Sequence, residues 1–125
     1  MTHIESYGVK TFIVGGYGGF DRLATKALVL AKQKHSEITL LRLIPYHPAE
    51  RPVKPPEGFD STYYPHGMEN VPRKLAIVKA NQYVVDRVDY LIAYAWHPAS
   101  NAFNLLEYAR RRKSIGITEL MRAQL

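Results

Sequence analysis

The sequence of 125 residues contains no cysteine. This absence excludes disulfide bonds, catalytic thiolates and zinc sites built on cysteine. The chain also lacks the run of about 18 apolar residues that a membrane-spanning helix needs. Its first residues show neither the charged start nor the apolar centre of a signal peptide. We therefore expect a cytoplasmic protein that does not contact a membrane.

Histidines are few and lack the spacing of metal ligands. We interpret them as surface or loop residues, and we expect no metal site. They are His3, His35, His47, His66 and His97.

Lysine and arginine outnumber aspartate and glutamate, which gives a formal net charge of +6. Such an excess favours nucleic acids or small anionic ligands as partners. The densest basic run, residues 110–113, lies at the end of a predicted helix, where cations interact favourably with the helix dipole. We prefer this structural explanation, so nucleic acid stays an open but not favoured partner.

Glycine is concentrated in one place: residues 15–19 contain four glycines. They follow the β-branched and aromatic run 11–14, which predicts a buried strand. Asp21 then opens a predicted helix over residues 22–34. A glycine-rich turn from strand to helix exposes unpaired backbone N–H groups at the positive end of the helix dipole, so it favours a phosphate site. The pattern is neither the dinucleotide-binding fingerprint nor a Walker A loop, and a simple tight turn is the alternative.

The remaining pattern predicts one α/β domain with a parallel sheet. With a hydrophobic content of 46%, the chain can form a proper core.

Residues 1–8 are polar with little to bury, and Arg42 is expected near a sheet edge. The predicted strands are 11–14, 38–44, 89–95 and 114–118, and the predicted helices are 22–34, 70–87 (capped by Asn70) and about 101–109. The expected apolar faces are Leu23, Ala24, Ala27, Leu28 and Ala31 in the first helix, Ile77, Asn81, Val84 and Val88 beside Ala80 in the second, and Ala102, Leu105, Leu106 and Ala109 in the third.

A long segment, residues 45–72, contains seven prolines and almost no periodicity. A segment of this kind is usually a lid or a binding loop, or is disordered. Its aromatic residues offer surfaces on which a base can stack, or they fold the segment onto the body of the protein. These aromatic residues are Tyr46, His47, Tyr63, Tyr64 and His66.

Three features fall at the carboxyl edge of the predicted sheet: the glycine turn, the segment 45–72 and the turn 96–101. Ligands of open parallel sheets bind at that edge. On the predicted helix 70–87, the amide of Asn81 lies on an apolar face, so it either bonds a neighbouring backbone or faces a ligand.

Over residues 8–118 the chain resembles the SLOG superfamily of small bacterial and phage proteins, close to the DUF1273 (YpsA-like) group and more distantly DprA and LOG proteins. The resemblance implies a Rossmann-like, three-layer α/β fold with a mostly parallel sheet of about four strands, and a nucleotide or nucleotide-derived ligand. The matching pieces are Phe12-Ile13-Val14-Gly15-Gly16-Tyr17-Gly18-Gly19-Phe20-Asp21, Ile44-Pro45-Tyr46, Tyr64-Pro65-His66-Gly67-Met68-Glu69-Asn70-Val71-Pro72-Arg73, Ala76-Ile77 with Asn81, and Asp89-Tyr90-Leu91-Ile92-Ala93-Tyr94 with His97.

The chain departs from these proteins in two places. They begin with a further strand ending in Gly-His-Arg and a helix, whereas nothing before Val9 supplies either, although residues 4–7 match the end of that helix. A shortened version, a gap filled by another subunit and a degenerate ligand site are the open explanations. In the SLOG proteins the last helix begins with Gly-Gly-Ala. This chain has Ser100-Asn101-Ala102 at that place, where side chains would crowd a phosphate.

We expect a nucleotide or nucleotide-sugar ligand whose phosphate is held at the glycine turn, and a homo-oligomer. One alternative is a LOG-like nucleoside-phosphate N-glycosidase, with Glu69, Asp21 and His97 as candidate catalytic groups. The other is an interaction or DNA-associated protein. The candidate ligand-binding residues are Gly15, Gly16, Tyr17, Gly18, Gly19, Asp21, Arg22, Tyr46, Glu69, Arg73, Asn81, His97, Ser100 and Asn101.

Overall fold

A computed structural model describes residues 2–15, 19–50, 54–93, 101–112 and 115–119. The chain forms two compact units, Met1–Glu69 and Asn70–Leu125.

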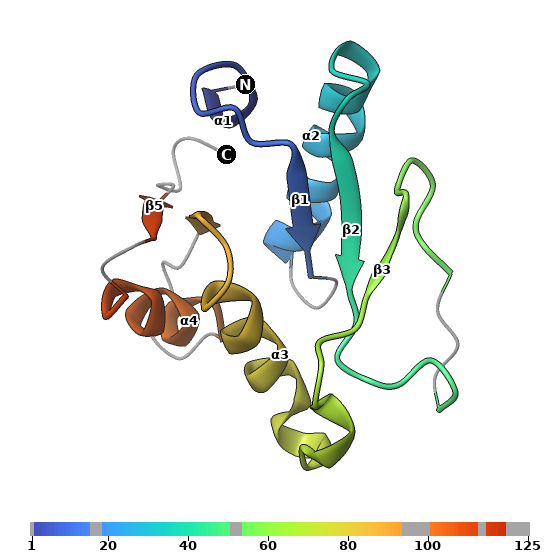
Figure 1. Ribbon diagram of the computed structural model, residues 1–125, viewed down its shortest axis with the longest axis vertical. Helices are drawn as coiled ribbons and strands as arrows, with labels where there is room; N and C mark the ends of the chain where they lie inside the picture. Colours follow the sequence, from blue (N-terminus) through green and yellow to red (C-terminus); the bar gives the residue numbers. More distant parts are fainter. Residues whose placement is uncertain (1, 16–18, 51–53, 94–100, 113–114, 120–125) are drawn as a thin grey trace. The chain divides into compact units, whose positions relative to one another are not determined.

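The first unit contains a three-stranded parallel sheet with β2 in the middle (Figure 1). Pairing runs from Thr11 opposite Thr39 at one end to Leu43 opposite Tyr63 at the other. The predicted α/β class with parallel strands is confirmed. The strands are β1 (Thr11–Val14), β2 (Thr39–Leu43) and β3 (Ser61–Tyr63).

Helix α2 (Gly19–Lys34) connects β1 to β2 and covers the sheet. It begins three residues before the predicted start at Arg22. Its inner stripe is the buried Leu28 with the partly buried Ala24 and Ala31, which pack in one cluster of apolar side chains with the strands. Leu23 and Ala27, which were also expected on the apolar face, are exposed.

A four-residue helix, α1 (Thr2–Glu5), packs against the same cluster. Ile4 and His3 are both buried, and the His3 ring meets Tyr7 edge-on at 5.1 Å. The predictions that residues 1–8 bury little and that His3 is a surface or loop residue are therefore wrong. A helix of only four residues is stabilised by this packing, since it is too short to form by itself.

Arg42 lies on the middle strand, so its predicted position near a sheet edge is wrong. Its guanidinium donates a hydrogen bond of 3.1 Å to the hydroxyl of Thr25 on α2 and lies 5.4 Å from the ring of Phe59. The long aliphatic stem allows a charged residue to occupy this half-buried position.

The predicted long loop contains β3, which the sequence analysis missed. Asp60, just before β3, is bonded twice to Leu40: its N–H donates to the Leu40 carbonyl (2.9 Å), and its carboxylate accepts from the Leu40 N–H (2.8 Å). The same carboxylate forms an ion pair with Lys32 of α2. One side chain therefore connects α2, β2 and the start of β3.

The second unit contains two helices and a pair of parallel strands. The predicted helix 70–87 is wrong in its first part, because that part forms short 3-10 turns and Asn70 does not cap the helix. Leu75 is the N-cap and makes no side-chain capping bond. The elements are η1 (Met68–Asn70, at the boundary of the units), η2 (Arg73–Leu75), α3 (Ala76–Val85), β4 (Tyr90–Ala93), α4 (Asn101–Arg110) and β5 (Gly116–Glu119).

The buried face of α3 is centred on Ala76 and Ala80, which are 2% and 0% exposed. The predicted stripe of Ile77, Asn81 and Val84 is half-buried beside it. On α4, Leu106 and Ala109 are fully buried as expected, and Leu106 packs with side chains of β4 and β5.

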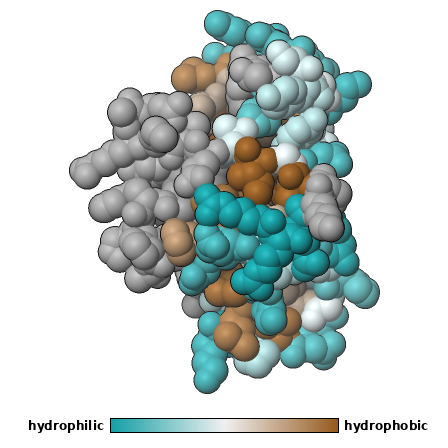
Figure 2. All heavy atoms as spheres, turned by 90° about the vertical axis from the view of Figure 1, so that its left-hand side faces the viewer, coloured by the Kyte–Doolittle hydropathy of each residue, from teal (hydrophilic) through white to brown (hydrophobic). Residues whose placement is uncertain are grey.

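Within the described ranges, no helix has the length and apolar content that crossing a membrane requires. The face drawn in Figure 2 is largely hydrophilic, with smaller groups of hydrophobic side chains exposed between the polar ones.

Candidate functional site

The three strands of the first unit run in the same direction, so their carboxyl ends meet at one edge of the sheet. Gly15 follows β1 at this edge, and Tyr46 and Tyr64 follow β2 and β3. The pairing of β2 with β3 extends one bond further, from the Ile44 N–H to the Tyr63 carbonyl at 2.9 Å. This edge is the candidate functional site.

Asp21, in the first turn of α2, directs its carboxylate back over Gly15. A Cβ placed on Gly15 would stand 3.1 Å from Asp21 Oδ2 and 3.6 Å from Asp21 Cγ. Glycine is therefore the residue that leaves room for this carboxylate. A negative charge in the first helical turn is favoured by the helix dipole.

A second group lies after β2 and β3 at the same edge. The rings of His47 and Tyr64 meet edge-on, with centroids 5.4 Å apart. His47 Nδ1 accepts a hydrogen bond of 3.0 Å from the Ala49 N–H, so the neutral ring carries its proton on Nε2. The Tyr64 hydroxyl donates a long hydrogen bond, 3.5 Å, to Glu69 Oε2.

The pKa of Tyr64 is raised, first by burial of the ring and then by the neighbouring Glu69 carboxylate. Both effects disfavour the phenolate. Tyr64 is therefore a neutral hydroxyl at physiological pH, and it can donate or accept a hydrogen bond but does not act as a base.

The structure places only some of the predicted ligand-binding residues at this edge of the sheet. Gly15 and Asp21 lie together, and Glu69 lies against Tyr64. Arg22 is exposed on α2, and Tyr46 is half-buried after β2. Gly19 is the first residue of α2. The predicted residues Gly16, Tyr17, Gly18, His97 and Ser100 lie outside the described residues.

Three further predicted residues belong to the second unit. Arg73 is exposed in η2, Asn101 begins α4, and Asn81 is half-buried in α3. No hydrogen bond of the Asn81 amide is present within the part of the chain that the structure describes.

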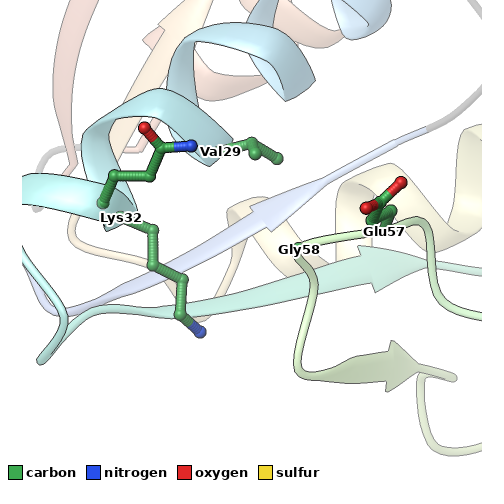
Figure 3. A pocket seen from close by; sticks show the side chains of 5 residues that line it. Val29, Lys32, Glu57 and Gly58 are labelled. Carbon is green, nitrogen blue, oxygen red and sulfur yellow. The ribbon is translucent and has the colours of Figure 1, made fainter.

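A shallow pocket of about 410 Å³ lies elsewhere in the first unit. Figure 3 shows Val29 and Lys32 reaching from α2 toward the turn that carries Glu57 and Gly58. This pocket adjoins the last turns of α2, and therefore the amino-terminal edge of the parallel strands. Lys32 is already paired with Asp60. The pocket offers no set of groups for catalysis and is not the site expected of a parallel sheet.

Sequence reasoning missed the grouping of His47, Tyr64 and Glu69, although it noted each residue. The grouping depends on β3, whose three residues are too short to be recognised from periodicity. Within the described ranges, no three His, Asp or Glu side chains are arranged to hold a metal ion.

Comparisons of this chain with protein-family models, with curated proteins and with solved structures give no match.

Proposed function

We propose that this protein binds a nucleotide or nucleotide-derived ligand, in the manner implied by its resemblance to the SLOG superfamily, at the carboxyl edge of β1, β2 and β3. The relation of Asp21 to Gly15 carries the proposal. It joins a strand end, a residue without a side chain and the first turn of a helix, which together suit a phosphorylated sugar.

The charge of the Asp21 carboxylate determines which part of the ligand can lie beside it. A carboxylate accepts hydrogen bonds, so it suits the hydroxyls of a ribose. A phosphate about 4 Å away would be repelled by about 4 kcal/mol at an effective dielectric of 20. We therefore expect the ribose at Asp21 and the phosphate further along the turn, at the backbone N–H groups that begin α2.

The aromatic group after β2 and β3 suits the base. Tyr46 and Tyr64 are half-buried, and His47 is exposed with its Nε2–H directed away from its bond to Ala49. A planar base gains from contact with such rings, by about 1–3 kcal/mol per stacked base. This arrangement supports a nucleoside more than an isolated phosphate.

The test is a thermal-shift and calorimetry series with AMP, ADP, adenosine, ribose 5-phosphate and inorganic phosphate. Nucleotides are expected to raise the unfolding temperature most, and phosphate alone least. Asp21→Asn should weaken ribose-containing ligands on the order of tenfold, because an amide accepts through one oxygen only. Glu57→Gln removes an exposed carboxylate at the opposite edge and should leave binding unchanged. The proposal fails if no nucleotide or nucleoside binds, or if both variants bind like the parent protein.

The Tyr64–Glu69 contact also favours the alternative of an N-glycosidase, since such a reaction needs a carboxylate near the sugar. Free base released from a bound nucleotide, and lost in Glu69→Gln, would establish it. Binding without base release would leave the protein a binding protein.

A further inference from the structure

The positive charge of the chain is concentrated in the second unit. Residues 70–125 contain nine Lys and Arg and four Asp and Glu, a formal charge of +5. Residues 1–69 contain eight Lys and Arg and seven Asp and Glu, a formal charge of +1. The ligand site proposed above therefore leaves most of the excess charge unexplained.

The carboxyl-terminal ends of α3 and α4 meet at Asp86. The Tyr108 hydroxyl contacts both oxygens of this carboxylate, at 2.9 and 3.0 Å. Arg112 Nη2 lies 2.9 Å from Asp86 Oδ1 and also contacts the Tyr108 hydroxyl. These contacts fix two helix ends side by side.

Basic and aromatic residues occupy α3 and the carboxyl-terminal ends of both helices. Lys79, Tyr83 and Arg87 follow at spacings of four, so they occupy one stripe along α3 and just beyond it. The guanidinium of Arg87 lies 3.5 Å above the ring of Tyr83, and that of Arg112 lies 4.6 Å above the ring of Tyr108. We call these residues, with Arg111, the Arg–Tyr surface: Lys79, Tyr83, Arg87, Tyr108, Arg111 and Arg112.

Local anions do not neutralise this surface. It has four cations, and the carboxylate that touches it is Asp86. Each helix end adds roughly half a negative charge, so the net charge of the surface, with Asp86 included, stays near +2. Lys79 and Arg111 are exposed and form no ion pair within the described part of the chain. Dipole compensation, the explanation preferred from the sequence, therefore accounts for only part of the charge.

We propose that the Arg–Tyr surface binds single-stranded nucleic acid. Guanidinium groups match phosphate with paired hydrogen bonds, and a guanidinium plane can also stack on a base. Single strands bind to this combination of cations and stacking planes, largely without regard to sequence.

The test measures fluorescence anisotropy of a labelled oligothymidylate of about 20 nucleotides, over salt concentrations from about 50 to 200 mM. The full chain is compared with Lys79→Ala/Arg111→Ala. Removing two phosphate contacts should lower the slope of log affinity against log salt by about 1.4 and weaken binding on the order of tenfold at 100 mM. Neither side chain has a partner to lose among the described residues, so the variant is expected to fold, which thermal unfolding checks.

Lys26→Ala/Lys34→Ala is the matched control, because it removes the same charge from exposed lysines of α2 that have no ion-pair partner among the described residues. It should retain most of the affinity and slope. Equal losses in the two double variants would show diffuse attraction to net charge and overturn the proposal. So would the absence of binding at 50 mM salt, or binding to anionic vesicles that depends on Lys79 and Arg111 while the oligonucleotide does not bind. AMP binding at Asp21 is unaffected by either outcome.

Discussion

Asp21 Oδ2 lies 3.1 Å from the point at which a Cβ on Gly15 would stand. The carboxylate and the glycine are six residues apart: Gly15 follows β1, and Asp21 lies in the first turn of α2. Whatever holds the carboxylate there, a methyl group on Gly15 requires it to move by a few tenths of an ångström. The position of Asp21 and the absence of a side chain at residue 15 are thus one structural feature.

Gly15→Ala is expected to cost about 1 kcal/mol of unfolding free energy and to weaken any ligand that bonds Asp21. Urea unfolding measures the first effect and calorimetry the second. In an Asp21→Ala background the cost of Gly15→Ala should fall, because the atom in its way is gone. Equal costs in both backgrounds would contradict the contact.

Protonation of His3 should loosen α1. Burial lowers the pKa of His3 below its ordinary value of 6.5. The unfolded chain therefore takes up the proton first, so this stabilising contribution is complete above about pH 6.5 and is lost as pH falls through the lowered pKa. His3→Gln should remove this part of the pH dependence, as measured by urea unfolding at about pH 5 and pH 8.

An NMR titration of the His3 ring gives its pKa directly. A value at or above 6.5 would contradict the expectation.

Asp60 should contribute to stability at neutral pH and lose that contribution in acid. The Lys32 ammonium and then the Leu40 N–H bond its carboxylate and hold the pKa of Asp60 below its usual 3.8. The contribution is therefore present above about pH 4 and is lost as pH falls through the lowered pKa. Asp60→Asn should be less stable than the parent protein at pH 7 and indistinguishable from it well below pH 3, in urea unfolding series. Glu57→Gln, an exposed neighbour outside these bonds, should follow the parent curve throughout.

Gly116 leaves room for an aromatic ring. It pairs with Tyr90 across β4 and β5, and a Cβ on Gly116 would lie 2.7 Å from Tyr90 Cδ1. Gly116→Val is therefore expected to destabilise the second unit by about 1–3 kcal/mol, since the ring must be displaced. Thermal unfolding of Gly116→Val and of the double variant with Tyr90→Ala measures the effect. The double variant should recover part of the stability that Gly116→Val loses. If it recovers none, the destabilisation does not come from the Tyr90 ring.

The sequence predicts the elements with strong patterns. Helix α2, strand β1 and the buried residues Leu106 and Ala109 follow from apolar spacing, because burial selects the residues that face the sheet. The shared carboxyl edge follows from the parallel order of the strands.

Other features depend on contacts between distant residues, which periodicity does not encode. Strand β3 is three residues long and is fixed by Asp60, a residue 20 positions from its partner Leu40. Burial of His3 depends on how α1 meets the cluster around Leu28. The contact of Tyr64 with His47 depends on β3 in turn, so this part of the site could not be derived before the strand was known.

The two bonds between Asp60 and Leu40 also determine the alignment of the sheet's shortest strand. A shift of β3 by one residue would break both bonds and reverse which way each of its side chains points. Tyr64, one residue past β3, would then turn away from His47, which follows β2. An aspartate just before the strand thus contributes, through strand alignment, to the assembly of the aromatic part of the candidate site.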